Sequence, residues 1–272
     1  MRKISVTESE SLHDNLELMS TRQLLEGINN EDKKVASAIK KIIPKIEHFV
    51  DAAHLRMKEG GRLFYIGAGT SGRLGIVDAS EVPPTYGTTS DWVVGIIAGG
   101  DGAIRAAVEN AEDDYNGAWK DLSLYKLTSK DILLGIAASG RTPYVIGGLK
   151  SANKHGMLTA CIVCNPKTEI AKLSDHKMEV IVGPEFVTGS TRMKAGTATK
   201  LVLNMISTSL MIKLGRVKGN KMLDMQMSNS KLLDRGVKML MNEINVDEAT
   251  AKKMIAQYGN VRKSIQAYHS KH

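Results

Sequence analysis

The sequence has few aromatic residues and no concentrated block of positive charge. Aromatic side chains make up 4% of its 272 residues, and the basic residues are scattered along the chain rather than arranged in a stripe. A protein that binds nucleic acid is expected to present clustered basic residues on one face. The formal net charge of +8 therefore does not indicate a nucleic acid as partner, although it is compatible with an anionic substrate.

The chain also has only two cysteines, Cys161 and Cys164, within the segment TACIVCNP. This segment is typical of a β-strand, in which alternation would direct the two thiols to opposite faces. Neither a second cysteine pair nor a nearby histidine supplies further ligands, so the pattern predicts buried, reduced thiols rather than a metal site. Reduced thiols suit a reducing compartment.

Long apolar segments are missing as well. The N-terminal MRKISVTESE has no apolar core of a signal peptide, and LVLNMISTSLMI is too short and too polar to span a bilayer. We therefore expect a soluble cytoplasmic protein that does not bind a membrane. With 42% hydrophobic residues, the chain is long enough for one principal domain and a smaller appendage.

Three segments follow one another along the chain. Residues 1–60 are expected to form a helical arm, with a turn at Gly27–Asn30 and a last helix that ends at Gly60. From 61 to 220, nearly all-apolar strand segments alternate with helical segments, which predicts an α/β fold with a parallel sheet covered by helices on both faces. Residues 221–272 predict short helices and resemble a small three-helix module of the ubiquitin-associated type.

Two glycine loops follow predicted strands and carry hydroxyl side chains. In Gly67–Arg73, glycines allow a sharp turn, and Thr70 and Ser71 follow at the start of a helix. Exposed N–H groups there, together with the helix dipole, suit a phosphate. A dinucleotide site begins with a similar loop, but GAGTSG lacks the third glycine, and the second strand ends in IIAGGD rather than in a lone acid.

The second loop comprises Ser139, Gly140, Arg141 and Thr142, followed by Pro143 at an expected first helical position. In parallel sheets, binding sites lie beyond the carboxyl ends of the strands, where both loops are expected. Two such loops at one edge favour a phosphorylated sugar. The alternative is that Ser139 and Thr142 only cap their helix.

Candidate acidic residues lie in the helical segments that follow the first two predicted strands. A helix expected from Ala103 to Tyr115 has an apolar stripe bordered by Glu112 and Asp114, and the pattern does not choose between these two acids. Glu81 precedes Pro83 and Pro84, which are expected to stop its helix. From the pattern alone, Glu81 would be an exposed glutamate at a helix end.

Several strings together resemble one known family, the N-acetylmuramic acid 6-phosphate etherases. They are LFYIGAGTSGRLGIVDASEVPPTYG, IIAGGDGAIRAAVENAEDD, GIAASGRTPYVIGGL and EFVTGSTRMKAGTATKLVLNMIST. The resemblance implies a flavodoxin-like, three-layer sugar isomerase (SIS) domain that assembles as a homodimer. It also implies removal of D-lactate from N-acetylmuramic acid 6-phosphate during peptidoglycan recycling, without a metal or organic cofactor.

The resemblance also assigns residues. It places the two catalytic glutamates at Glu81, as acid, and Glu112, as base, and the phosphate-binding hydroxyls at Ser71 and in the Ser139–Thr142 loop. Lys194, within TRMKAGT, is a further candidate for a substrate contact. A carboxylate that removes the C2 proton and an acid that protonates the leaving lactate oxygen would permit elimination.

Two other functions use the same loops. The glucokinase regulatory proteins resemble this family and sense sugar phosphates without catalysis, but they carry two SIS domains, and this chain has room for one. An aldose-ketose phosphosugar isomerase would move a proton between carbons. The strings DASEVPPTYG and TRMKAGT argue against an isomerase.

Overall fold

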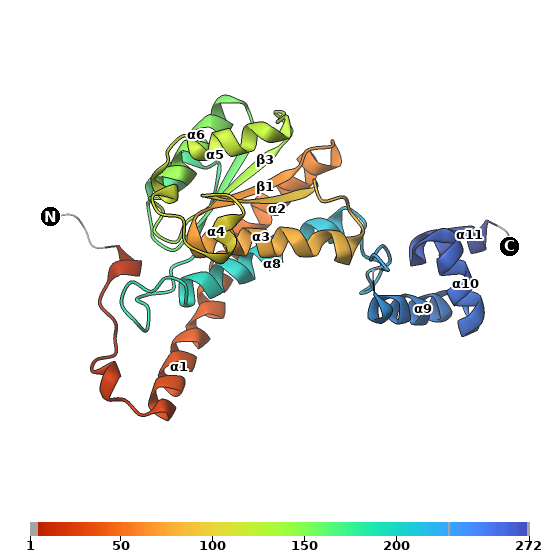
Figure 1. The fold of residues 1–272 in the computed structure, drawn as a ribbon, viewed down its shortest axis with the longest axis horizontal. Coiled ribbons are helices and arrows are strands. Elements are labelled where there is room, and N and C mark those ends of the chain that lie inside the picture. Colours follow the sequence, from red (N-terminus) through yellow and green to blue (C-terminus); the bar gives the residue numbers. More distant parts are fainter. Residues whose placement is uncertain (1–4, 228, 271–272) are drawn as a thin grey trace.

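The computed structural model describes residues 5–227 and 229–270, and its centre is a five-stranded parallel sheet between two layers of helices (Figure 1). The outermost ends of the predicted arm and tail, residues 1–4 and 271–272, lie outside the described residues, as does residue 228. The strands are β1 Leu63–Gly67, β2 Val93–Ile97, β3 Ile132–Ile136, β4 Leu158–Val163 and β5 His176–Glu179. Their order, β2-β1-β3-β4-β5, is the flavodoxin-like order, so the predicted fold class is confirmed.

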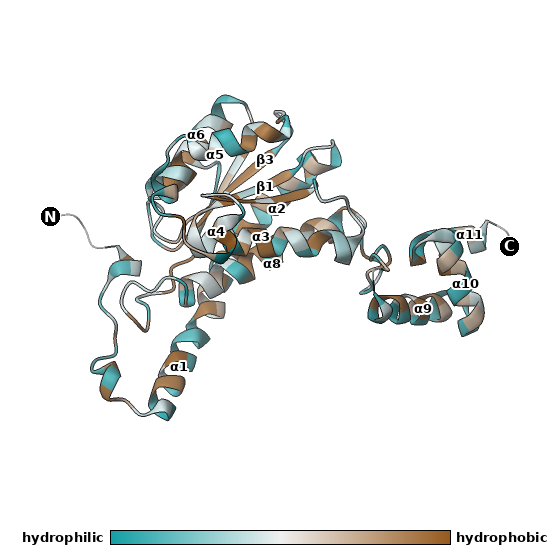
Figure 2. Ribbon diagram, viewed as in Figure 1, coloured by the Kyte–Doolittle hydropathy of each residue, from teal (hydrophilic) through white to brown (hydrophobic). Residues whose placement is uncertain are grey.

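Helices cover both faces of the sheet. One face packs against α1 Thr21–Lys40, α2 Ile43–Lys58, α3 Gly69–Tyr86 and α8 Lys194–Lys213, and the other against α5 Gly117–Leu122, α6 Pro143–Lys154 and α7 Glu169–Leu173. Figure 2 shows the hydrophobic residues gathered in the strands between these layers. Strands β1 to β4 are buried on both faces and are therefore almost entirely apolar, which explains why their sequences do not alternate. The edge strand β5 is less buried and carries His176, Lys177 and Glu179.

The two cysteines lie on opposite faces of the sheet, as predicted. Cys161 belongs to the core beneath α6, and Cys164 to the core beneath α8. Both are buried free thiols. Burial raises the pKa of Cys161 to about 11 and that of Cys164 to about 12. Thiols with such values are protonated at neutral pH and therefore poor nucleophiles.

Helix α1 is continuous, so the turn predicted at Gly27–Asn30 is wrong. A capping box starts the helix, in which Ser20 Oγ accepts from Gln23 N and the Gln23 side chain accepts from Ser20 N. A Cβ at Gly27 would lie 2.6 Å from a ring carbon of Phe186. The glycine thus permits close packing of the helix on Phe186 and does not mark a turn.

Helix α3 continues through Pro83 and Pro84, so the predicted stop is also wrong. Proline lacks an N–H group, but its fixed φ is compatible with a helix, and Val82 and Tyr86 are buried on either side of the pair. The helix ends at Gly87, which is left-handed at φ 62 and donates its N–H to Pro83 O. Glu81 consequently lies on the last turns of a longer helix.

The helix expected from Ala103 to Tyr115 does not form. Helix α4 covers only Gly102–Arg105, and the chain then becomes extended at Ala106. Arg73 Nε donates to Ile104 O over 2.8 Å, which occupies a carbonyl that a longer helix would use. A short 3₁₀ turn, η3 Ala111–Asp113, carries Glu112 instead.

The remaining elements are short 3₁₀ turns and a separate group of helices. The other 3₁₀ turns are η1 Val6–Glu8, η2 Leu16–Leu18 and η4 Ser123–Tyr125. Helices α9 Ser230–Ile244, α10 Glu248–Tyr258 and α11 Val261–His269 pack around their own apolar cluster, away from the sheet (Figure 1).

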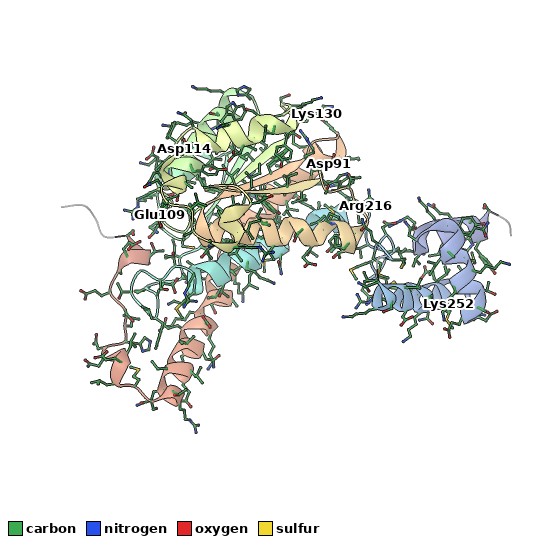
Figure 3. All side chains as sticks on the ribbon, in the orientation of Figure 1. Asp91, Glu109, Asp114, Lys130, Arg216 and Lys252 are labelled. Atoms are coloured by element: carbon green, nitrogen blue, oxygen red, sulfur yellow. The ribbon has the colours of Figure 1, made fainter. Side chains whose placement is uncertain are left out.

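Two arginines lie at the junction between α8 and the C-terminal helices. Arg262 Nε donates to both carboxylate oxygens of Asp224, at 2.8 and 2.9 Å, and Arg262 Nη2 donates to Gly215 O. The guanidinium of Arg216, labelled in Figure 3, lies over the Trp92 ring at 4.5 Å from the ring centroid. None of the helices in the described ranges is both long and apolar enough to cross a membrane.

Candidate active site

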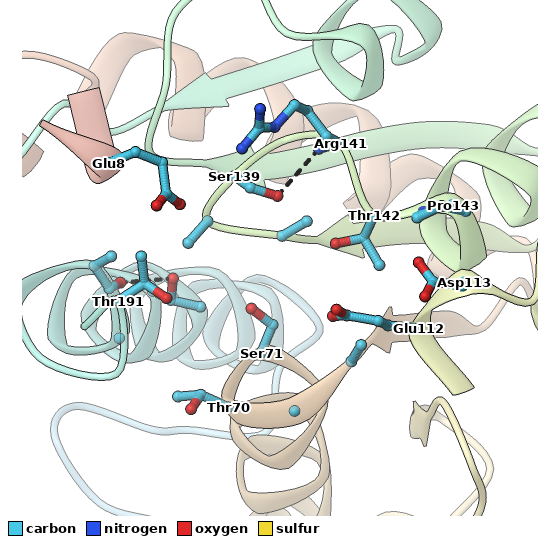
Figure 4. A pocket seen from close by; sticks show the side chains of 17 residues that line it. Glu8, Thr70, Ser71, Glu112, Asp113, Ser139, Arg141, Thr142, Pro143 and Thr191 are labelled. Carbon is cyan, nitrogen blue, oxygen red and sulfur yellow. Dashed lines mark hydrogen bonds between the residues drawn. The ribbon is translucent and has the colours of Figure 1, made fainter. Parts of the chain in front are cut away.

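A cavity of about 470 Å³ lies at the carboxyl ends of β1 and β3 (Figure 4). The strand order reverses between these two strands, and such switch points form crevices in parallel sheets. The first turns of α3, α6 and α8 line the cavity, together with η1 and η3. Its side chains include those of Glu8, Thr70, Ser71, Glu112, Asp113, Ser139, Arg141, Thr142, Thr191 and Thr199.

The hydroxyls in this cavity are not used as helix caps. Helix α3 has Ala68 at its N-cap, and Thr142, the N-cap of α6, makes no capping bond with its side chain. Ser139 Oγ accepts from Arg141 N over 3.2 Å, which leaves its own hydroxyl proton for a ligand (Figure 4). The capping alternative therefore does not describe Ser139 and Thr142. Pro143 occupies the first position of α6, as predicted.

Gly140 does not line the cavity itself but allows the loop to turn. Its φ of +68 lies in the left-handed region, and a Cβ there would come within 2.3 Å of Thr168 Cγ2. Any larger residue would displace the Ser139–Thr142 loop from α7, because both the backbone conformation and the space require glycine.

The electrostatics at one end of the cavity favour an anion. The N-terminus of a helix carries about +0.5 of an elementary charge on its unpaired N–H groups. Glu185, which is buried, accepts from Lys194 N and Ala195 N at 2.9 Å and so neutralises the start of α8. The starts of α3 and α6 remain available, and Arg141 is the one cationic side chain among the described residues that line the cavity.

The two predicted catalytic glutamates are not brought together within one chain. Glu112 lines the cavity, whereas Glu81 lines a separate groove of about 260 Å³ between α3 and α8. Ser71 and Glu81 stand ten residues apart on α3, which is about 15 Å along a helix axis. Asp114, the alternative to Glu112, instead accepts from Asn116 N and Gly117 N at the start of α5.

Comparison with known proteins gives the chain a family. A model of the glucokinase regulatory protein N-terminal SIS domain matches residues 41–153, and an SIS domain model matches residues 109–209. An N-acetylmuramic acid 6-phosphate etherase of Christiangramia forsetii is 58% identical over 98% of this chain and 97% of its own. The chain belongs to the N-acetylmuramic acid 6-phosphate etherase family. A Bacteroides thetaiotaomicron relative of the same name is 54% identical over 98% of this chain and 97% of its own.

Solved structures agree on the fold. A phosphoheptose isomerase from Francisella tularensis has a TM-score of 0.53 at 17% identity, and covers 71% of this chain and 98% of its own. A protein of E. coli CFT073, solved as a ligand complex, has a TM-score of 0.53 at 18% identity, over 74% and 97% of the two chains. At such identities the likeness shows the SIS fold and no more.

Lys194, from the family string TRMKAGT, lies outside this cavity. Its side chain is buried, and its Nζ lies 2.5 Å from Glu31 Oε2 on α1. Glu31 also accepts from Lys34 Nζ at 2.7 Å and pairs with His13 Nε2 at 3.1 Å. Burial alone would raise the pKa of Glu31, but the hydrogen bonds from Lys194, Lys34 and His13 lower it to about 2. In the described structure Lys194 joins α8 to α1.

This buried pair predicts an acid-sensitive fold. Because the folded-state pKa of Glu31 is about 2 against an ordinary 4.5, its stabilisation is complete above pH 4.5 and is lost as the pH falls toward 2. Replacing Glu31 with Gln should cost about 3 kcal/mol at pH 7, because Lys194 would remain buried and unpaired. Urea unfolding at pH 7 and pH 3 measures the free energy of unfolding of three proteins: the wild type, Glu31→Gln and the exposed control Glu26→Gln. A Glu31→Gln protein as stable as the control at pH 7 would contradict it.

The variant Ser71→Ala tests whether this end of the cavity binds the phosphate. Ser71→Ala removes one donor among several, and a hydrogen bond to a charged group contributes about 1.5–3 kcal/mol. We expect KM to rise by about tenfold or more with little change in kcat. Steady-state kinetics measure both constants, and Ser80→Ala, an exposed site on the same helix whose hydroxyl bonds to Val77 O, is the control. An unchanged KM would remove Ser71 from the binding site.

The pattern-based predictions missed several cavity residues. Glu8, Asp113, Thr191 and Thr199 line it without belonging to either glycine loop. Thr191 lies within the family string TGSTRMKAGT, which was a usable signal. No signal in the sequence pointed to Glu8, because it lies far along the chain from the other residues that line the cavity.

Proposed function

We propose that this protein cleaves the D-lactyl ether of N-acetylmuramic acid 6-phosphate to N-acetylglucosamine 6-phosphate and D-lactate. The observation that carries the proposal is a single cavity that combines the N-termini of α3 and α6, neither of which has a side-chain cap, and the hydroxyls of Ser71 and Ser139 with the carboxylate of Glu112. The etherase relatives at 54% and 58% identity support the same substrate. A sugar-phosphate sensor and an isomerase are not favoured by these relatives. We place the reaction in the cytoplasm, in the recycling of peptidoglycan amino sugars.

The phosphate is expected at the starts of α3 and α6. The first N–H groups of α3, those of Gly69, Thr70 and Ser71, are not used by bonds within the helix. Helix α6 begins with Pro143, which has no N–H group, and Val145 N donates to Thr142 O, so α6 contributes its dipole rather than a row of N–H groups. Ser71, Ser139 and Thr142 present hydroxyls to the same space (Figure 4). Donors that are already fixed in place lose little entropy when they bind a dianion. With the phosphate held at this end, the sugar ring extends toward the acids that line the remainder of the cavity.

The chemistry follows from the position of the ether. Its carbon, C3, is β to the latent aldehyde C1, so removal of the C2 proton allows the C3–O bond to break. We assign Glu112 as the base that takes this proton and Glu81 as the acid that protonates the departing lactate oxygen. Water then adds to C3 of the unsaturated aldehyde, and C2 is reprotonated. No step in this scheme needs a metal or an organic cofactor.

Because Glu81 lies in a different groove from Glu112, the proposed reaction requires two copies of the chain. If Glu81 and Glu112 act on one substrate, Glu81 has to come from a second copy of the chain, because its own copy places it in another groove. Val77 on α3, which is 53% exposed, lines the groove, and Met205 on α8, which is 40% exposed, follows the groove residue Asn204. Such surfaces are typical of protein contacts, and we propose a two-fold symmetric homodimer. Light scattering at micromolar concentration should give twice the chain mass of 29.6 kDa.

Solvent labelling tests the reaction itself. In heavy-oxygen water, elimination and addition should place the label at C3 of the product sugar, while the lactate keeps the original ether oxygen. In deuterated water, the product should carry deuterium at C2. Mass spectrometry of both products measures this. Heavy oxygen in the lactate, or C2 without deuterium, would refute elimination, and no lactate at all would refute the substrate.

A further inference from the structure

The N-terminal segment from Ser5 to His13 is bonded to the wall of the cavity. Thr7, fully buried, accepts at Oγ1 from Asn165 Nδ2 over 2.8 Å, and its N–H donates to Asn165 Oδ1 over 3.2 Å. Asn165 Nδ2 also donates to Ala138 O at 3.0 Å. One amide therefore joins the N-terminal segment to the residue that directly precedes Ser139.

A second anchor holds the segment on the other side of Glu8. Ser11 N donates to Thr188 Oγ1 over 2.9 Å, and Ser11 Oγ donates to Phe186 O over 2.7 Å. These partners belong to the loop that leads into α8, whose first turns also line the cavity. Glu8 lies between the two anchors, so its position at the cavity is set by tertiary contacts on both sides.

The Glu8 carboxylate projects into the cavity and carries an unused acceptor. Figure 4 shows it on the side of Thr191, across the cavity from Glu112 and Asp113. Within residues 5–227 and 229–270, no side chain or backbone N–H is hydrogen-bonded or ion-paired to this carboxylate. An acid held over a cavity without a partner in the protein is available to a ligand.

We propose that Glu8 is a substrate-binding residue, which accepts hydrogen bonds from the N–H or O–H groups of the amino sugar. This inference rests on the function proposed above. A carboxylate repels a phosphate dianion, whereas hydroxyl and acetamido groups supply the donors that it requires. Glu8 thus orients the ligand, with the phosphate at the starts of α3 and α6 and the neutral donors of the sugar toward η1.

Replacing Glu8 with Gln tests this role, with Glu10→Gln as the matched control. Glu10 is an exposed glutamate two residues away and does not line the cavity. The amide keeps one acceptor oxygen but loses the charge, so kcat/KM for lactate release should fall about tenfold, mainly through KM. Glu8→Ala, which removes the acceptor entirely, should lower kcat/KM further. Glu10→Gln should match the wild type.

Inhibition by two ligands separates binding from a loss of structure. N-acetylglucosamine 6-phosphate should inhibit Glu8→Gln about tenfold more weakly than wild type. Inorganic phosphate should inhibit it equally or more strongly, because a nearby negative charge is gone. Equal weakening of both ligands would show a displaced cavity and overturn the proposal, as would unchanged affinity for the sugar phosphate. A wild-type protein that releases no lactate would refute the proposed function instead, and direct binding of the same two ligands would still decide the role of Glu8.

Discussion

Glu112→Gln should lower kcat for lactate release by about 10²–10⁴-fold, the usual contribution of a positioned proton-transfer group. The amide keeps the shape of the side chain but cannot take the C2 proton. Glu112 is exposed on η3, and none of the described residues bonds to its carboxylate, so the fold should be unaffected. Glu81→Gln should lower kcat to a similar degree, because the lactate oxygen would leave without a proton.

Steady-state lactate release, with circular dichroism as a check on folding, measures both variants. The matched control is Glu109→Gln, since Glu109 is exposed in the same segment as Glu112 but does not line the cavity (Figure 3). It should retain wild-type kinetics. Near-normal activity in Glu112→Gln would leave Glu8 or Asp113 as the base. Near-normal activity in Glu81→Gln would remove the need for a second chain.

Mixing the two inactive variants should restore activity. If each active site takes Glu112 from one chain and Glu81 from its partner, a mixed dimer contains one doubly altered site and one intact site. Random pairing of equal amounts makes half of the dimers mixed, so about a quarter of wild-type activity should return. Each single variant should retain at most about a hundredth of wild-type activity. The mixture should therefore be at least about 25-fold more active than either variant alone.

Coexpression with two different affinity tags yields the mixed dimer, and its lactate release is compared with that of each variant alone. The control is a mixed dimer in which one chain carries both Glu81→Gln and Glu112→Gln and the other carries Glu112→Gln alone. This dimer contains no intact site. A verified mixed dimer without activity would place both proton-transfer groups in the same chain. In that case Glu81 could not be the acid, given its separate groove.

Where the sequence predictions were wrong, distant contacts overrode a local signal. Ala103 to Tyr115 has helical periodicity, but Arg73, which lies on another helix, takes the carbonyl of Ile104 and the helix stops. Gly27 indicated a turn but instead admits the ring of Phe186. Periodicity and turn propensity describe neighbours along the chain, and they contain no information about a side chain that arrives from another element.

The sequence by itself determined the sheet, both glycine loops and the family, because each depends on local pattern. Apolar strands need burial on both faces, and the loops after β1 and β3 need glycine, whatever else surrounds them. Only the tertiary structure decided which charged groups meet. It buried Lys194 against Glu31, brought Glu8 to the cavity and left Glu81 in another groove. The positions of Lys194 and Glu81 depend on how α1, α3 and α8 pack, and that of Glu8 on the bonds of Thr7 and Ser11 to distant loops. Such packing follows from the shape and burial of whole elements rather than from any single motif.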